Sequence, residues 1–225
     1  MPTPIRLALT FLAGAAIFVG LPLLAWGPGE AGGFLANPAR AAYVALALGL
    51  NAYASVMIPE VGKPRARSRR LVARQRIAVR LLQVLPLAIV AWGPYADRRA
   101  LAVIPWPSVR WAGVAMYAAG FLLMHWAEAH LGRLFSVQVA IQEGHTLVTD
   151  GPYRLVRHPR YLGIIVFAAG LALVFRSWPA LVLAVAIKLV LLWRIRDEEA
   201  LMAGEFGDEW TAYARRSWRL VPGVY

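Results

Sequence analysis

Long apolar runs constrain this chain more than any other feature of its sequence. Several reach the roughly 20 residues that an α-helix needs to cross a bilayer. They are continuous rather than alternating, which disfavours a β-barrel. Hydrophobic residues make up 60% of the 225 residues and charged residues only 16%, a balance that soluble domains rarely show. The sequence therefore predicts an all-α, polytopic membrane bundle.

The turn-forming residues between these runs set the predicted spans. We expect about five to six spans, the last two forming a helical hairpin, with an amphipathic tail helix after them, in the cytoplasmic segment 197–225. Residues 93–107 are rich in turn formers and predict a loop. The expected spans are about 5–26, 39–59, 77–92 and 109–127, and the two arms of the hairpin are about 161–175 and 178–195.

The charges set a predicted orientation. The formal net charge is +12, but the positive residues lie between apolar runs, so we expect contacts with membrane lipids and no nucleic-acid partner. With the N-terminus inside, eighteen of the 24 lysines and arginines fall on the inner side. This multi-pass topology places both termini in the cytoplasm. The chain has no cysteine, which excludes disulfides and thiolate chemistry.

Two polar stretches flank the hairpin and carry the residues of chemical interest. The first is 151–163 and the second is 194–199. Because a hairpin returns its two ends to the same side of the bilayer, we expect these stretches to meet at one membrane surface. The orientation above makes that surface, and any active site on it, cytoplasmic.

The start of the last hairpin has the features of an anion site. Pro159 suits the first helical position, and a helix N-terminus attracts negative groups. His158 and Arg160 add hydrogen-bonding or positive groups there, and Tyr161 follows on the first turn. The alternative is an interfacial collar of basic residues with a tyrosine anchor.

The second stretch places charge at the end of an apolar arm. Arg194 lies one helical turn before Glu198, so the two side chains can face each other. A carboxylate turned toward a membrane bundle is costly and usually functional. The alternative is a solvated, ion-paired helix end.

Histidine and glutamate near the end of the fourth span raise the question of a metal. His125 and Glu128 lie three residues apart, and His130 follows. No other helix offers a matching set of ligands, so we predict no metal site.

Taken together, the motifs from 130 to 222 resemble the isoprenylcysteine carboxyl methyltransferase family of integral membrane enzymes. Trp210 departs from the pattern, since the family often has tyrosine there. The matching residues, in order, are Gln138, His145, Thr146, Leu147, Val148, Gly151, Tyr153, Arg157, His158, Pro159, Tyr161, Gly163, Arg194, Glu198, Glu199, Phe206, Gly207 and Tyr213.

The resemblance implies S-adenosylmethionine as the cofactor, in a pocket between the last helices and the connecting segment. It also implies that Arg194 faces the methyl acceptor and that Arg194 and Glu198 form the catalytic pair. The implied cofactor-binding residues are Gln138, His145, Thr146, Leu147, Val148, Tyr153, His158, Pro159, Arg160, Tyr161 and Glu198.

The function implied is methyl transfer to a lipophilic acceptor that enters from the bilayer, an isoprenylcysteine-type carboxylate. Residues 1–127 would form the acceptor side, and residues 128–225 would form the cofactor-binding connector, hairpin and tail. Three alternatives stay open: a phospholipid amine or small thiol as acceptor, an NADPH-dependent membrane reductase of the sterol type, and a non-enzymatic membrane protein.

Overall fold

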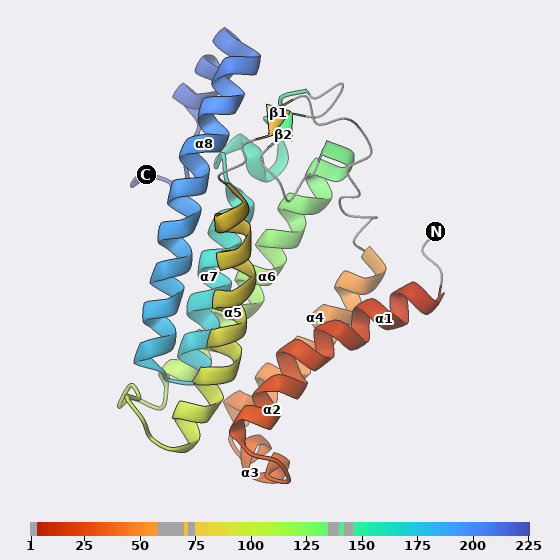
Figure 1. Cartoon of the computed structure of the whole chain (residues 1–225), viewed down its shortest axis with the longest axis vertical. Coiled ribbons are helices and arrows are strands. Elements are labelled where there is room, and N and C mark those ends of the chain that lie inside the picture. Colours follow the sequence, from red (N-terminus) through yellow and green to blue (C-terminus); the bar gives the residue numbers. More distant parts are fainter. Residues whose placement is uncertain (1–3, 58–69, 72–74, 135–139, 142–145) are drawn as a thin grey trace.

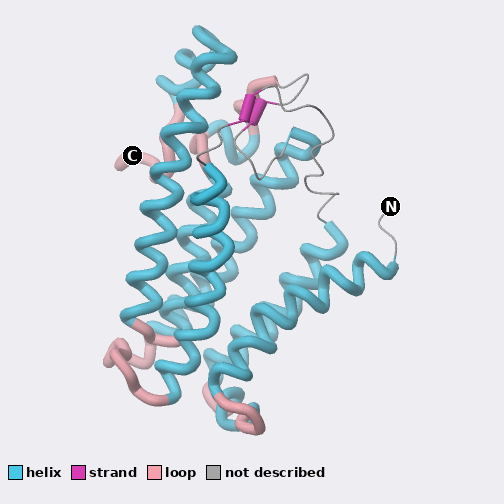
Figure 2. The backbone as a smooth tube through the Cα atoms, viewed as in Figure 1, coloured by secondary structure: helices cyan, strands magenta, loops and turns pink. Residues whose placement is uncertain are grey.

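A computed structural model describes residues 4–57, 70–71, 75–134, 140–141 and 146–225, and helices dominate them (Figures 1 and 2). Two short strands, β1 (Arg70–Leu71) and β2 (Ala140–Ile141), pair antiparallel and so join two connectors far apart in sequence. The helical elements are α1 (Pro4–Ala15), the π-helical turn η1 (Ala16–Gly20), α2 (Leu21–Trp26), α3 (Ala31–Leu35), α4 (Pro38–Met57), α5 (Gln75–Arg98), α6 (Val109–Leu131), the 3-10 turns η2 (Gly132–Leu134) and η3 (Gly151–Arg154), α7 (Pro159–Val174) and α8 (Trp178–Arg216).

Glycines allow α6 and α7 to pack backbone against backbone. Gly113 and Gly120, two turns apart on α6, face Gly170 and Gly163 on α7. A Cβ atom at Gly120 would lie 2.7 Å from the carbonyl oxygen of Gly163, and one at Gly163 would lie 2.8 Å from that of Gly120. Small residues of this kind allow close helix association in membranes. The first turn of α7 is therefore held against a fixed neighbour.

Helices α7 and α8 form the predicted hairpin. The chain reverses at 175–177, and the Ser177 hydroxyl accepts a 3.3 Å hydrogen bond from the Ala180 backbone N–H, which caps α8. Pro179 lies in the first turn, where its missing N–H costs nothing. The reversal brings the start of α7 and the second half of α8 to the same end of the bundle (Figure 1).

Helix α5 is longer than the sequence predicts. It continues through Gly93 and Pro94 to Arg98, so the predicted end of this span at Trp92 is wrong. A Cβ atom at Gly93 would approach the Phe175 side chain to 3.0 Å, so this glycine serves packing against the hairpin turn. In a membrane bundle, proline inside a helix is tolerated because neighbouring groups satisfy the freed backbone.

Helix α8 is also longer than predicted, since the second arm of the hairpin is expected to end at about residue 195 and the helix runs on to Arg216. The break lies instead at Gly207, whose φ of 51° interrupts the helical geometry. Trp210 and Tyr213, after this break, are 8% and 3% exposed. The tail helix therefore follows Gly207, within the predicted segment 197–225, and packs on the protein.

A buried charge cluster joins the N-terminal helices to the rest of the bundle. Asp97 at the end of α5 pairs with Arg40 of α4 at 3.2 Å and with Arg110 of α6 at 2.7 Å. Arg110 also donates a 2.7 Å hydrogen bond to the Val174 carbonyl at the end of α7. This cluster lies at the opposite end of α7 from Pro159. Toward that other end, α1 leans away from α5–α8 (Figure 1).

The outer faces of these helices suit a lipid environment. Among the residues that the structure describes, three stretches are long and apolar enough to cross a membrane: Pro4–Trp26, Gln75–Arg98 and Trp178–Phe206. Outward-facing side chains such as Leu9 and Val182 are 62% and 68% exposed. The chain is an integral, multi-pass membrane protein, and the total of five to six spans stays a prediction.

Candidate functional site

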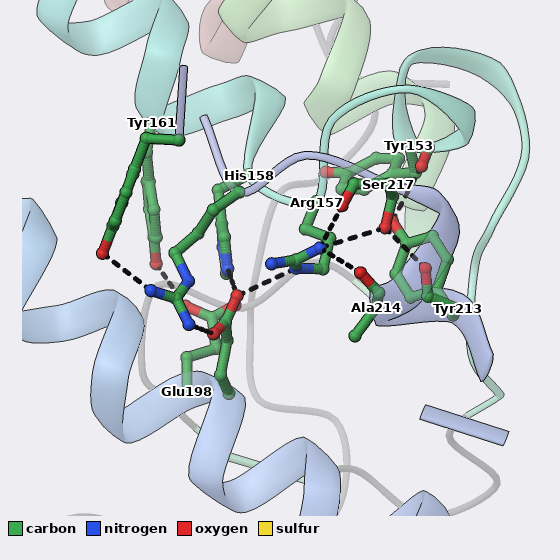
Figure 3. A network of polar contacts seen from close by, with 11 residues as sticks. Tyr153, Arg157, His158, Tyr161, Glu198, Tyr213, Ala214 and Ser217 are labelled. Atoms are coloured by element: carbon green, nitrogen blue, oxygen red, sulfur yellow. Dashed lines mark hydrogen bonds and ion pairs between the residues drawn. The ribbon is translucent and has the colours of Figure 1, made fainter. Parts of the chain in front are cut away.

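The two polar stretches meet through the hydroxyl group of Tyr161 (Figure 3). This hydroxyl donates a 2.6 Å hydrogen bond to Oε2 of Glu198. It also accepts a 2.7 Å hydrogen bond from Nε of Arg194. Tyr161 stands on the first turn of α7, whereas Arg194 and Glu198 lie one turn apart on α8. The hairpin thus brings a phenol, a guanidinium and a carboxylate into one hydrogen-bonded chain. Tyr161 and Arg194 are buried, and Glu198 is half-buried.

His158 continues this arrangement from the residue that precedes α7. It takes the N-cap position before Pro159, with φ −123° and ψ 57°, and is only 6% exposed. Its ring lies flat against that of Tyr161. Its Nε2 lies 3.3 Å from Oε1 of Glu199. The sequence pattern grouped His158 with Glu198, and the structure adds Glu199 as its direct contact.

Arg160 is held by a carboxylate that sequence reasoning did not assign to the site. Its Nε donates a 2.7 Å hydrogen bond to Oε1 of Glu128, near the end of α6. The other oxygen of Glu128 lies 2.8 Å from Nδ1 of His125. His125 and Glu128 therefore engage each other and Arg160. Within the described residues, no group of three or more His, Cys, Asp or Glu side chains is arranged to hold a metal ion.

The connector before α7 contributes residues of two kinds. Thr146 is exposed, and Leu147 and Val148 are half-buried. Tyr153 is buried; its hydroxyl donates a 3.3 Å hydrogen bond to the Ala127 carbonyl, and burial raises the pKa of its phenol well above the usual range. Two other predicted cofactor-binding residues, Gln138 and His145, lie outside the described residues.

One buried polar pair near the site escaped sequence reasoning. Gln75, at the start of α5, donates a hydrogen bond from Nε2 to the carboxylate of Asp197 on α8. The two residues are 3% and 6% exposed. Asp197 lies next to Glu198 but faces α5 instead of α7. The sequence does hold a signal for Asp197, because it lies three residues after Arg194 and so adds a charged side chain to the turn that carries Arg194 and Glu198.

The site lies within a stretch of the chain that matches a known protein family. The family model described as the isoprenylcysteine carboxyl methyltransferase (ICMT) family matches residues 113–204. Over this region, the chain is similar to that family. The matched part contains the α6–α7 glycine contacts, Tyr161, Arg194 and Glu198. The C-terminal residues after 204 lie beyond the match.

Two curated relatives and one solved structure extend the comparison. Protein-S-isoprenylcysteine O-methyltransferase B of Arabidopsis thaliana is 31% identical over 115 residues, which cover 50% of this chain and 58% of the relative. The cobalt-zinc-cadmium resistance protein CzcN of Cupriavidus metallidurans is 36% identical over 96 residues, 42% of this chain and 44% of the relative. The match therefore spans little more than half of the first relative and less than half of the second.

The structural comparison covers the whole chain. The solved structure of a eukaryotic intramembrane Ras methyltransferase of the ICMT type matches with a TM-score of 0.55 at 16% identity, over 100% of this chain and 88% of that one. At this identity the likeness shows the fold. The chain therefore shares the helical fold of that structure along its full length, whereas the match to the ICMT family model is confined to residues 113–204.

Proposed function

We propose that this chain is an integral membrane methyltransferase that transfers a methyl group from S-adenosylmethionine to a lipophilic acceptor, an isoprenylcysteine-type carboxylate. The observation that carries the proposal is the contact of Arg194 and Glu198 with the hydroxyl of Tyr161. It gathers the residues that the family motif would assign to the acceptor and to the cofactor. The match to the ICMT family over residues 113–204 and the similarity to the curated methyltransferase relative support it.

The chemistry of the side chains fits S-adenosylmethionine, which supplies a methyl group on a positively charged sulfur. Glu198 is half-buried and carries a negative charge suited to the ammonium or sulfonium group. His158 and Arg160 flank the N-terminus of α7, where a carboxylate is favoured. The half-buried Leu147 and Val148 offer apolar surface to an adenosine. Gln138, His145, Thr146, Tyr153, Pro159 and Tyr161 complete the proposed set.

Arg194 is proposed to orient the acceptor. A guanidinium presents a planar fork of donors that matches a carboxylate. The hydrogen bond from its Nε to Tyr161 sets the plane of this fork. Methyl transfer depends on alignment and on partial desolvation of the nucleophile more than on a strong base. A buried, oriented arginine beside Glu198 meets this requirement.

The positive residues support a cytoplasmic site. Eighteen of the 24 lysines and arginines fall on the side that would hold His158 and Glu198. We propose that the cofactor enters there from the cytosol, and that residues 1–127 form the acceptor side while residues 128–225 bind the cofactor. The acceptor would then enter from the bilayer.

The acceptor class is tested by incubating purified protein in lipid nanodiscs with methyl-labelled S-adenosylmethionine and prenylcysteines, amine lipids or small thiols in parallel. We expect label on the prenylcysteine that mild alkali releases, because a methyl ester hydrolyses whereas an N-methyl or S-methyl product does not. Label on an amine or thiol would keep the methyltransferase and replace the acceptor. Binding of NADPH without binding of S-adenosylhomocysteine would contradict the proposal.

The role of Arg194 has its own test. Arg194→Ala should bind S-adenosylhomocysteine as the unmodified protein does and lose turnover. Normal turnover in this variant would refute the proposed acceptor contact.

A further inference from the structure

Glu199 contacts a different set of residues from its neighbour Glu198. Its Oε1 accepts a 3.0 Å hydrogen bond from Nε of Arg157 and lies 3.3 Å from Nε2 of His158. Its Oε2 pairs with Nη2 of Arg219 at 2.8 Å. The Glu199 side chain is 13% exposed, and those of Arg157 and His158 are 10% and 5% exposed. One carboxylate thus joins the residues before α7 to the C-terminal segment.

The C-terminal segment, Ser217–Tyr225, also pairs with the residues before α7 through its backbone. The Trp218 N–H donates to the Leu155 carbonyl at 2.9 Å, and the Arg157 N–H donates to the Trp218 carbonyl at 2.7 Å. The His158 N–H donates to the Arg219 carbonyl at 3.2 Å. These bonds form a short parallel pairing that leads directly into α7.

Arg157 strengthens the same junction from its other side. Its Nη1 donates to the Ala214 carbonyl at 2.9 Å and to the Ser217 carbonyl (Figure 3). The guanidinium therefore bonds both Glu199 and the end of α8. A carboxylate between two arginines offsets their mutual repulsion, and its removal leaves like charges facing each other with little water.

We propose that Glu199 and Arg219 are positioning residues that fix His158 and the first turn of α7, so that the C-terminal segment completes the site. Arg219 lies beyond the part of the chain that matches the family, whereas Glu199 lies within it. The His158 ring contacts the Glu199 carboxylate through Nε2, and its face stacks on the Tyr161 ring. The consequence for cofactor binding rests on the proposed function, whereas the positioning itself does not.

Hydrogen exchange tests the positioning without any cofactor. In the unmodified protein, amides in peptides covering 154–162 should exchange slowly. Glu199→Gln and Arg219→Ala should each speed that exchange about tenfold, because the backbone bonds of Arg157 and His158 open more often. Arg219→Lys should restore most of the protection, since one ammonium can replace the single Nη2 contact. Arg215→Ala is the matched control, because Arg215 is an exposed arginine in the last turn of α8, just before the C-terminal segment.

Two results would overturn the proposal. One is exchange in 154–162 that stays at the unmodified level in both Glu199→Gln and Arg219→Ala. The other is faster exchange spread over the whole bundle with a lowered unfolding temperature, which indicates general destabilisation. Faster exchange confined to 154–162 and reversed by Arg219→Lys supports it.

Cofactor affinity then separates this proposal from the proposed function. Arg219→Ala should weaken binding of S-adenosylhomocysteine about tenfold, Arg219→Lys should recover it, and Arg215→Ala should leave it unchanged. Unaltered affinity in Arg219→Ala would overturn the link from this segment to the site. If the unmodified protein binds no S-adenosylhomocysteine, the proposed function fails, while the exchange data still decide the positioning role.

Discussion

The rings of His158 and Tyr161 lie parallel, with centroids 5.4 Å apart and an interplanar angle of 1°. This stack connects two polar networks that would otherwise be separate. Tyr161 bonds Arg194 and Glu198, and His158 contacts Glu199. The stack therefore couples the orientation of Arg194, which we propose orients the acceptor, to the C-terminal segment.

Tyr161→Phe should impair the site while keeping the fold. The change removes the hydroxyl that bonds both Arg194 and Glu198, and hydrogen bonds to charged groups are worth about 1.5–3 kcal/mol. We expect turnover to fall at least tenfold in the labelled-methyl assay. Tyr95→Phe, at the other end of the bundle and 37% exposed, is the control. Equal turnover in the two variants would argue against a role for the hydroxyl.

Gly120→Ala should destabilise the bundle. A Cβ atom there would lie 2.7 Å from the Gly163 carbonyl oxygen, so the α6 and α7 backbones must separate. Overpacking of this kind costs about 1–3 kcal/mol. The thermal unfolding temperature in detergent should drop. Gly49→Ala is the control, because no atom lies within 4 Å of a Cβ at Gly49; a similar drop in both would contradict the packing explanation.

Asp97→Asn should be more damaging to stability than loss of an exposed ion pair. It leaves Arg40 and Arg110 without their shared counter-charge in a place where the Asp97 side chain is 2% exposed. Breaking a buried pair in this way costs about 3–5 kcal/mol. Glu30→Gln, which removes the exposed partner of Arg98, should cost about 1 kcal/mol or less. Chemical unfolding of both variants measures the difference, and equal costs would be inconsistent with a buried cluster.

Tyr213 should give the protein a stability loss at high pH. Burial raises the pKa of its phenol from 10.0 to about 12. Because the folded pKa is the higher one, this contribution is complete below about pH 10 and is lost as the pH rises toward 12. Its hydroxyl also donates a 2.7 Å hydrogen bond to the Tyr153 carbonyl. Tyr213→Phe should lose about 1 kcal/mol at neutral pH. Unfolding temperatures measured across this pH range should fall less steeply in the variant, and parallel curves would contradict the assignment.

The hairpin and the meeting of its two polar ends could be predicted from the sequence. Two consecutive apolar runs with one break at Ser177 and Pro179 allow few arrangements in a bilayer. The motif residues Tyr161, Arg194 and Glu198 then lie at one end by geometry alone. The identity of their contacts was not predictable, because it depends on side-chain directions that spacing does not define.

Two other features escaped prediction for identifiable reasons. The Gly93–Pro94 pair favours a helix end, which would put Asp97 in a loop, whereas α5 continues through the pair and carries Asp97 into the buried cluster. The pairing of Leu155 with Trp218 has no periodic pattern, because it involves only a few residues joined through backbone groups. Glu199 and Arg219 could therefore be connected only in three dimensions.

The charge cluster at Asp97 has a consequence for how such a protein can diversify. Its ion pairs hold α4 against the bundle beside Val174. Val174 lies about 22 Å along α7 from Pro159 at the usual rise per residue. Residues 1–57 can thus accumulate changes that reshape the lipid-facing half without disturbing the chemistry at the far end. An exchange of this segment between related proteins that keeps arginine at position 40 would join a new lipid-facing surface to an unchanged second half, which we propose binds the cofactor.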